Sequence, residues 1–340
     1  MNKRKTYLKI SALFLIGIMV ALTLGCTAPE PKTISVFHAG SLAQPFQAVE
    51  KNFETANKNV DAQLEGAGSV DTIRKVTDLG KEADVIGSAD YKLIPQMMYP
   101  DYADWYIVFA TNEIVLCYTD KSKYANEINA DNWYEVIQRP DVLWGFGNPN
   151  IDPCGYRTVM TIKLADLAYN KPVFDELLGS HTTITAKEEN GIYKITTPES
   201  LNPDTKYVTI RDKSEDLVSM TLAGGIDYAF EYRSVAEQNK LDYVELPPSI
   251  NLKDVKYDST YAKIHVTISN GKTQIAAPIA YGITVPKNAP NKDLGIKYAE
   301  QVINESGQKI FKEMGQPPTV PALGSGNVPE QLKKYVEMID

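Results

Sequence analysis

Three Gly-Ser pairs follow apolar, strand-like segments early in the chain. They stand in the stretches VFHAGSL (36–42), GAGSVDTIRKV (66–76) and DVIGSADY (84–91). Apolar residues recur at helical spacing after the first two pairs, so Ser41 and Ser69 are expected at the first turn of a helix. There the backbone N–H groups lack intrahelical partners and the dipole is positive, which favours an anion that Gly40 lets approach closely. Each serine can also be an ordinary N-cap, and Ser88 can simply stabilise its own turn.

A second group of polar residues lies in the middle of the chain, where NPNIDPCGYRTVM (148–160) runs from an irregular loop into a helix. Proline at a first helical turn is preorganised and donates no hydrogen bond, which predicts free N–H groups at Cys154 and Gly155. Asp152, Pro153 and Cys154 are therefore candidate residues of an anion site. A plain N-cap role for Asp152 is the alternative.

Two further segments can complete such a site. DKSEDL (212–217) opens another helix with Ser214 and Glu215 at its start, which places a carboxylate at a positive helix end. In the strand YAFEY (228–232), alternation puts all three aromatic side chains on one face, so one of the tyrosine hydroxyls can face the same site.

The elements that position these residues alternate between strand and helix. Strands are expected at 33–38, 59–65 and 83–88, and helices at 42–56, 69–79 and 91–98. This order predicts an α/β fold with a mostly parallel sheet, whose strands end at one common edge. The alternation continues over 131–246, and a polar stretch at 181–205 indicates a surface insertion or hairpin. The last segment, 291–338, is expected to be helical with one interruption at 315–329, and to pack back onto the first part.

Two long apolar strands, near 113–118 and 279–285, are far apart in the sequence. They predict a chain that leaves one lobe, builds a second and returns. Residues 33–114 with 285–340 would form the first lobe, and 115–284 the second. Ligands of open α/β sheets bind beyond the carboxyl ends of the strands, so the cleft between the lobes is the expected site, with closure around the ligand.

The first 26 residues have the features of an export signal. Basic residues at positions 3, 4, 5 and 9 precede an uncharged stretch, 10–24, that ends at Gly25-Cys26. A Gly-Cys after such a stretch resembles a lipoprotein processing site, with Cys26 as the lipid-bearing N-terminus and 27–31 as a tether. An uncleaved membrane anchor is the alternative, and both place the protein outside the cytoplasm.

Composition excludes several classes of partner. The formal charge is −8, and removing 1–25 with its four basic and no acidic residues makes it −12, so nucleic acid and an electrostatically held membrane surface are not expected. Beyond the signal only Cys117 and Cys154 remain, and a chain of this size needs no disulfide framework. The three histidines lie outside any metal-ligand spacing. Neutral N–H and hydroxyl dipoles can still bind a small anion.

Five segments together resemble the archaeal tungstate/molybdate-binding proteins of ABC transporters (WtpA/ModA type). They are VFHAGSL, GAGSVDTIRKV, DVIGSADY, NPNIDPCGYR and DYAFEYRSVAEQNKL, and the resemblance covers essentially the whole chain after residue 33. It implies an extracytoplasmic lipoprotein with a two-lobed, periplasmic-binding-protein-like fold of class II. Such a protein captures the oxyanion between its lobes and delivers it to a membrane permease. A monomer without catalytic activity or cofactor is expected.

The resemblance also implies the residues that meet the ligand. They are Gly40 and Ser41, Ser69, Asp152 with Pro153 and Cys154, a glutamate near 215, and Tyr232. One position departs from the family pattern Lys-Glu-x-Asp-Leu, because this chain reads Lys213-Ser214-Glu215-Asp216-Leu217. A one-residue shift turns a helical side chain by about 100°. Either the turn adjusts and Glu215 reaches the ligand, which we favour, or Ser214 replaces the carboxylate with a hydroxyl.

Carboxylates beside a doubly negative ligand are unfavourable at first sight, because like charges in a poorly solvated cleft repel strongly. Molybdenum and tungsten, however, can take more than four oxygen ligands, whereas sulfur and phosphorus in their tetraoxyanions cannot readily do so. Asp152 and Glu215 are therefore predicted to bind the metal directly and to raise its coordination from four towards six. Sulfate at the same place would meet only repulsion.

Three other functions are compatible with parts of the sequence. A sulfate- or phosphate-binding protein of the same architecture would use the same serines, but Asp152 would have to be protonated or turned away. A hydrolase with Ser41 as nucleophile needs a histidine in reach and a G-x-S-x-G-like elbow, which HAGSL lacks, and His38 is expected to be a packing residue. An adhesin or structural lipoprotein would not require three aligned Gly-Ser turns.

Overall fold

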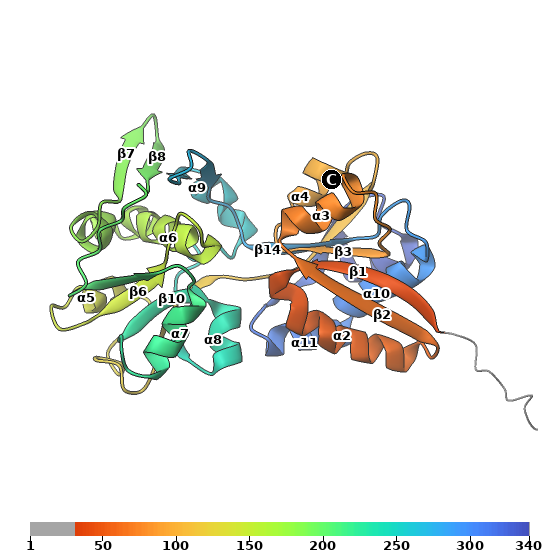
Figure 1. Ribbon diagram of the computed structural model, residues 1–340, viewed down its shortest axis with the longest axis horizontal. Helices are drawn as coiled ribbons and strands as arrows, with labels where there is room; N and C mark the ends of the chain where they lie inside the picture. Colours follow the sequence, from red (N-terminus) through yellow and green to blue (C-terminus); the bar gives the residue numbers. More distant parts are fainter. Residues whose placement is uncertain (1–30, 340) are drawn as a thin grey trace, which may run out of the picture.

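The computed structural model describes residues 31–339 and has two lobes (Figure 1). The first lobe is built on a seven-stranded sheet in the order β16-β15-β4-β14-β3-β1-β2. The second contains a five-stranded sheet, β11-β5-β10-β6-β9, and a four-stranded sheet, β13-β12-β8-β7. The predicted two-lobed α/β fold is confirmed. The predicted signal segment 1–26, with Cys26, lies outside the described residues.

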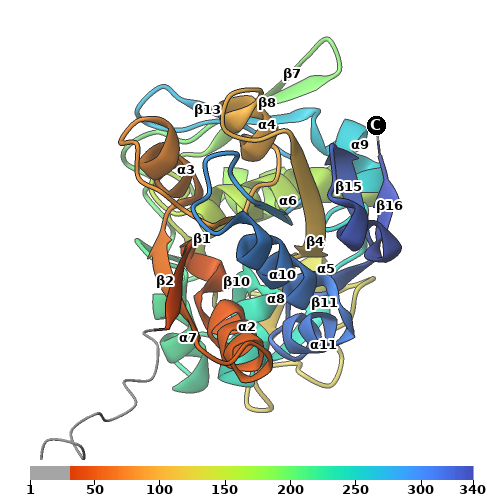
Figure 2. The same ribbon diagram turned by 90° about the vertical axis from the view of Figure 1, so that its right-hand side faces the viewer.

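The first lobe takes its elements from both ends of the described chain. Its strands are β1 (Lys32–Ala39), β2 (Val60–Ala67), β3 (Val85–Ser88), β4 (Trp105–Thr111), β14 (Ala280–Thr284), β15 (Pro318–Gly326) and β16 (Val336–Met338). Its helices are α2 (Ala43–Ala56), α3 (Ser69–Thr77), α4 (Leu93–Met98), α10 (Lys292–Ile303) and α11 (Glu305–Glu313), with short 3-10 turns η1 (Gly40–Leu42) and η4 (Glu330–Tyr335). Helices α2, α10 and α11 pack together, and α3 packs with α4 (Figure 2).

Alternation along β1 supplies apolar side chains to both faces of this sheet. Ile34 and Val36 belong to the core that includes Phe46 of α2, whereas Phe37 belongs to a separate core with Ile73 of α3. Phe46 is fully buried, and its ring meets the rings of Phe109, Tyr298 and Phe311 at centroid distances of 5.8–6.4 Å. These two cores hold the helices whose first turns reach the interlobe cleft.

The second lobe is built from the middle of the chain. Its strands are β5 (Ile114–Tyr118), β6 (Trp144–Gly147), β7 (Thr185–Glu189), β8 (Ile192–Thr196), β9 (Val208–Arg211), β10 (Tyr228–Tyr232), β11 (Asp242–Glu245), β12 (Ile264–Thr267) and β13 (Thr273–Ile275). Its helices are α5 (Trp133–Ile137), α6 (Pro153–Tyr169), α7 (Glu215–Leu222), α8 (Arg233–Asn239) and α9 (Asp258–Tyr261), with short turns η2 (Asp175–Gly179) and η3 (Val255–Tyr257). The long helix α6 buries most of its apolar side chains in the main core of this lobe.

Two chain segments pass between the lobes side by side. Strand β4 leads directly into β5 across Asn112 and Glu113, and the chain returns into β14 after Ile279. The Asn112 N–H donates to the Ile279 carbonyl at 2.8 Å, so the two crossings are hydrogen-bonded to each other. The lobe bounds 33–114 with 285–340 and 115–284 stay a prediction. The strand pairing adds that β14 belongs to the seven-stranded sheet.

Several details of the sequence-based prediction need correction. The sheets are mixed rather than mostly parallel, because β14 and β15 pair antiparallel in the first lobe and β5 does so in the second. The interruption near 315–329 is strand β15, and the chain after it forms a 3-10 turn and strand β16 instead of a helix. The hairpin expected within 181–205 is present as β7–β8.

No helix of residues 31–339 combines the length and the apolar character needed to cross a bilayer.

Candidate functional site

A cleft of about 550 Å³ opens between the lobes, and seven of the nine expected site residues line it. They are Gly40, Ser41, Ser69, Asp152, Pro153, Ser214 and Tyr232. The first three come from the first lobe and the other four from the second. The structure thus brings together residues that are up to 192 positions apart in the sequence, from Gly40 to Tyr232.

The turns after β1 and β2 lie next to each other because the two strands pair in parallel, with Ala39 opposite Ala67. Gly40 and Ser41 form the 3-10 turn that leads into α2, and no side chain caps its start. The Ser41 side chain is exposed, and its carbonyl accepts a hydrogen bond from Gln316 Nε2 at 2.8 Å. The turn is therefore held through its backbone, and the Ser41 side chain lines the cleft, where it is hydrogen-bonded to Tyr281.

Ser69 begins α3, and no side chain caps this helix either. Its Oγ accepts a hydrogen bond from the Ala89 N–H at 3.0 Å. A hydroxyl is both donor and acceptor, so its hydrogen can still be donated into the cleft. Ser88, by contrast, is buried, and its Oγ donates to the Asp90 carbonyl at 2.7 Å and accepts from the Asp90 N–H at 3.2 Å. The third Gly-Ser pair thus stabilises its own turn, the alternative stated from the sequence.

Asp152 is the N-cap of α6 and at the same time links two helix starts. Its Oδ1 accepts from the Cys154 N–H at 2.9 Å, and its Oδ2 accepts from the Ser214 N–H at 2.8 Å. The second bond spans 62 residues and ties α6 to the start of α7. Two backbone donors therefore fix the orientation of this carboxylate at the wall of the cleft.

Two glycines allow the start of α6 to sit against the end of β6. A Cβ on Gly147 would lie 2.0 Å from Asp152 Oδ2, and a Cβ on Gly155 would lie 2.2 Å from the Gly147 carbonyl oxygen. Both distances are far shorter than a van der Waals contact. The position of the Asp152 carboxylate therefore depends on the absence of side chains at these two residues.

The prediction of a free N–H group at Cys154 is wrong, because this N–H donates a hydrogen bond to Asp152 Oδ1. Cys154 is fully buried, and its Sγ lies 3.9 Å from the Phe230 carbonyl and 3.8 Å from Glu231 Oε2. Burial raises the pKa of its thiol well above the usual range. Cys154 is thus buried next to the cleft lining, and its backbone N–H holds the Asp152 carboxylate in place.

Ser214 is 2% exposed and stands immediately before α7, with its N–H directed to Asp152. Glu215 is the first residue of α7. Its side chain lies outside what the structure describes, so the choice between Glu215 and Ser214 as the ligand-contacting residue stays a prediction.

Tyr232 ends β10 and faces the cleft, where its hydroxyl oxygen accepts a hydrogen bond from Arg157 Nη1 at 2.5 Å. Arg157 lies one helical turn after Pro153 and also lines the cleft. Burial by itself would lower the pKa of Arg157, but electrostatic interactions with Tyr232 and Tyr156 raise it above the usual range. A fixed positive charge therefore stands in the cleft wall.

Sequence reasoning missed Arg157, although a signal was present. On a helix, residues i and i+4 share a face, so Arg157 points to the same side as Pro153. It also missed Asn112, which lies in the crossing segment and lines the cleft. Asn112 Nδ2 donates to Ser234 Oγ at 2.8 Å and to the Tyr281 hydroxyl at 3.0 Å. No local pattern marks Asn112, because its partners are 122 and 169 residues away.

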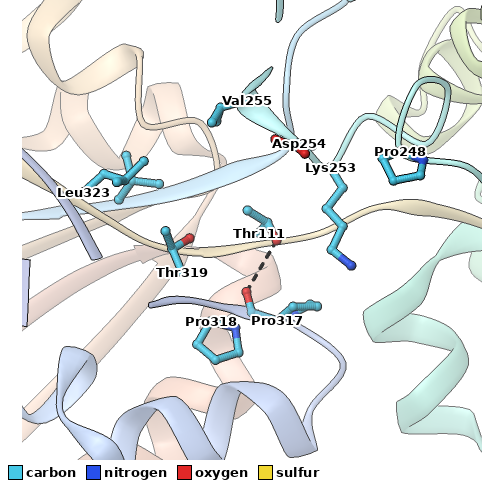
Figure 3. A pocket seen from close by; sticks show the side chains of 10 residues that line it. Thr111, Pro248, Lys253, Asp254, Val255, Pro317, Pro318, Thr319 and Leu323 are labelled. Carbon is cyan, nitrogen blue, oxygen red and sulfur yellow. Dashed lines mark hydrogen bonds between the residues drawn. The ribbon is translucent and has the colours of Figure 1, made fainter. Parts of the chain in front are cut away.

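A second cavity, of about 290 Å³, lies where β4 and β15 meet the loop 248–255 (Figure 3). Proline and aliphatic side chains form much of its wall, and the Thr111 hydroxyl donates to the Pro317 carbonyl at 3.4 Å. Its cation, Lys253, already pairs with buried Glu113 at 3.0 Å and with Glu245 at 3.4 Å. The interlobe cleft is therefore better suited to an anion.

The family model described as "Bacterial extracellular solute-binding protein" matches residues 34–316. The chain belongs to this family. Among individual members, it is 50% identical over 315 residues to an uncharacterized solute-binding protein of Methanoculleus marisnigri, a match that covers 92% of this chain and 88% of that protein. It is 47% identical over 346 residues to the molybdate/tungstate-binding protein WtpA of Pyrococcus abyssi, covering 97% and 98%. The corresponding protein of Thermococcus kodakarensis is 45% identical over 352 residues, covering 98% of each chain.

Solved structures of solute-binding proteins share the fold. The substrate-binding protein of an ABC transporter from Agrobacterium tumefaciens superposes with a TM-score of 0.53 at 14% identity, over 92% of this chain and 88% of that one. The periplasmic molybdate-binding protein of Azotobacter vinelandii gives 0.50 at 14% identity, over 83% and 98%. At such low identities the likeness shows the two-lobed solute-binding fold, and the choice of ligand has to come from the cleft.

Proposed function

We propose that this protein captures tungstate or molybdate in its interlobe cleft and delivers the oxyanion to an ABC permease. The observation that carries the proposal is the combination within one cleft of two uncapped helix starts, at Ser41 and Ser69, with a fixed carboxylate, Asp152. Helix starts with free N–H groups and hydroxyls suit an oxyanion. The similarity to the two WtpA proteins supports the same ligand class.

The fixed carboxylate supports a ligand whose central atom can expand its coordination. The Asp152 carboxylate accepts N–H hydrogen bonds from Cys154 and Ser214, and an ionised carboxylate has about four lone-pair sites in all. We infer that Asp152 and Glu215 supply oxygen ligands directly to molybdenum or tungsten. Gly40, Ser41 and Ser69 then bind the outer oxygens of the anion, as do Tyr232 and Ser214, while Pro153 and Cys154 shape the start of α6 around it.

Sulfate or phosphate is the competing ligand class for a cleft of this fold. Both would accept hydrogen bonds from the same serines and helix starts. A fully ionised sulfate has no hydrogen to donate to Asp152, and this carboxylate is held as a double acceptor at the cleft wall. Repulsion at this point therefore favours the metal oxyanions over sulfate.

Binding and release without covalent chemistry is the proposed mode of action. The nearest histidine in sequence to Ser41, His38, is 3% exposed and packs edge-on against Phe46 at 5.6 Å between ring centroids. Burial lowers its pKa. His38 is thus committed to the core.

Location follows from the family and the N-terminal sequence. Extracellular solute-binding proteins act outside the cytoplasm, and we propose that Cys26 carries a lipid that tethers this one, as a monomer, beside its permease. Treatment of cells with an inhibitor of lipoprotein processing would leave a larger, unprocessed precursor. Substitution Cys26→Ala would release the protein from membranes if the proposal holds.

Calorimetric titration of the full chain with tungstate, molybdate and sulfate tests the ligand. We expect saturable 1:1 binding of the two metal oxyanions and a raised melting temperature, because a ligand that binds only the native state stabilises it by mass action. X-ray absorption of the bound metal then distinguishes four-coordinate from six-coordinate centres. Tight binding of sulfate alone would assign the protein to the competing class.

A further inference from the structure

Arg157 carries the positive charge that the described wall of the cleft presents. The acidic side chains described there are Asp71, Asp90 and Asp152, and among residues 31–339 no lysine or second arginine lines the cleft. Arg157 lies on α6, one turn after the Pro153 that begins the helix. A dianion brought to this wall would therefore meet more negative than positive side chains, and Arg157 is the described cation that offsets them.

Two tyrosines hold the Arg157 guanidinium in place. Its Cζ lies 5.7 Å from the ring centroid of Tyr156 and 5.6 Å from that of Tyr232, within the range of cation–π contacts. Nη1 also donates to the Tyr232 hydroxyl at 2.5 Å. These contacts join α6 to the end of β10 across 75 residues of sequence. The side chain is thus preorganised, with little rotamer freedom left to lose when an anion binds.

The hydrogen bond fixes the direction in which Tyr232 can donate. A guanidinium has only donors, so the phenolic oxygen must be the acceptor in this pair. The Tyr232 hydrogen therefore cannot point at Arg157 and is left for another acceptor. Burial raises the pKa of Tyr232 well above the usual range, so the phenol keeps its hydrogen at neutral pH. Since Tyr232 lines the cleft, an oxyanion oxygen is the natural acceptor.

We propose that Arg157 is a positioning residue for the oxyanion, which aims the Tyr232 hydroxyl into the cleft and supplies the charge that lets a dianion lie beside Asp152. The proposal rests on the proposed function and adds a residue to it. The start of α6 at Pro153 places Arg157 four residues later, on the face that borders the cleft.

A double-mutant cycle in the full chain tests the proposal, with tungstate affinity measured by calorimetry. We expect Arg157→Met to weaken binding by about 30-fold and Tyr232→Phe by about 10-fold, magnitudes typical of hydrogen bonds to charged groups. If Arg157 acts through Tyr232, the double variant should lose about 30-fold rather than the 300-fold product, because the two effects share one interaction. Arg157→Lys keeps the charge and should fall between parent and Arg157→Met.

Arg139→Met is the matched control. Arg139 also lies over a tyrosine ring, that of Tyr124 at 3.9 Å, and pairs with Glu127, but it is absent from the lining of the cleft. Its substitution should leave tungstate affinity unchanged. The melting temperature without ligand, measured for all variants, separates folding from binding.

Two results would overturn the inference. Parent-like affinity of Arg157→Met would show that the cation is not used, and fully multiplicative losses would show that Arg157 does not act through Tyr232. If Arg157→Met fails to fold, the same cycle with Arg157→Lys decides by the same criterion. A parent protein that binds neither tungstate nor molybdate would remove the proposed function itself, an outcome visible before any variant is compared.

Discussion

The two lobes contribute to the cleft in different ways. The first lobe offers neutral donors at Ser41 and Ser69, each placed by its own strand, turn and helix, and its Asp71 and Asp90 also line the cleft. The second lobe offers Asp152 and Arg157, two charged groups held by hydrogen bonds that span 62 and 75 residues. A site of neutral donors can be built locally because backbone dipoles need no counter-charge. Buried charges need partners, and such partners come from elsewhere in the chain.

Removing the carboxylate of the second lobe should have the largest effect. We expect Asp152→Asn to weaken tungstate binding by about 100-fold, because the substitution keeps size and one oxygen but removes the charge needed for a strong metal–oxygen bond. Discrimination against sulfate should also relax. Calorimetry with both anions measures the two effects, and Glu215→Gln should behave alike if Glu215 is the second ligand.

Asp254→Asn is the control for this prediction. Asp254 likewise caps a short helical turn, accepting from the Lys256 N–H at 2.9 Å, but it is absent from the lining of the cleft. If both variants bind tungstate as the parent does, Asp152 is only a helix cap. If Ser214→Ala weakens tungstate binding more than Glu215→Gln does, the serine and not the glutamate contacts the ligand.

Glycine-to-alanine substitutions should show that the second lobe is more tightly packed around its site residue than the first, even without ligand. At Gly147 the added methyl group would lie 2.0 Å from Asp152 Oδ2, so Gly147→Ala should destabilise the fold by about 1–3 kcal/mol and weaken tungstate binding. At Gly40 nothing lies within 4 Å, so Gly40→Ala should leave stability within about 0.5 kcal/mol of the parent. Urea unfolding of both variants measures this. Equal losses would mean that the second lobe is no more tightly constrained than the first.

Single hydroxyls of the first lobe should have smaller effects. Ser41→Ala and Ser69→Ala should each weaken tungstate binding by about tenfold, which corresponds to about 1.4 kcal/mol, with little change in melting temperature. Ser88→Ala should instead lower the melting temperature and leave tungstate affinity unchanged. In the interactions described, this buried hydroxyl forms hydrogen bonds only within its own turn. A sharp fall in melting temperature for Ser69→Ala at unchanged affinity would make Ser69 a structural residue.

An ion pair between the lobes should have the smallest effect. Lys92 Nζ, before α4, lies 3.1 Å from Asp258 Oδ1 in α9, and both side chains are partly exposed. Such pairs contribute about 0–1 kcal/mol and are screened by salt. Lys92→Met should therefore shift the balance between open and closed forms only slightly, and only at low salt. Solution scattering with and without tungstate measures closure, and a radius of gyration that never changes on binding would exclude a closing hinge.

Much of the first lobe could be predicted because its signals are local. The turns at Ser41 and Ser69 lie at the ends of adjacent parallel strands, as expected from the alternation of strand and helix. Prediction failed where pairing is non-local. Strand β15 was taken for an interruption between helices, because its prolines and glycines carry no strand signal and only pairing with β4 and β16 makes it extended. The antiparallel pairing of β14 likewise follows from the return of the chain between lobes.

The sequence by itself determined the family, the two-lobed fold and the residue types that gather at the cleft. Short-range patterns encode these, since strand, turn and helix start are set by neighbouring residues. Only the tertiary structure decided that the Cys154 N–H is taken by Asp152, that Asp152 bridges to Ser214, and that Arg157 reaches Tyr232. These contacts depend on how α6, α7 and β10 converge, and the free energy of burying polar groups is settled by partners that only the folded chain brings within hydrogen-bonding distance.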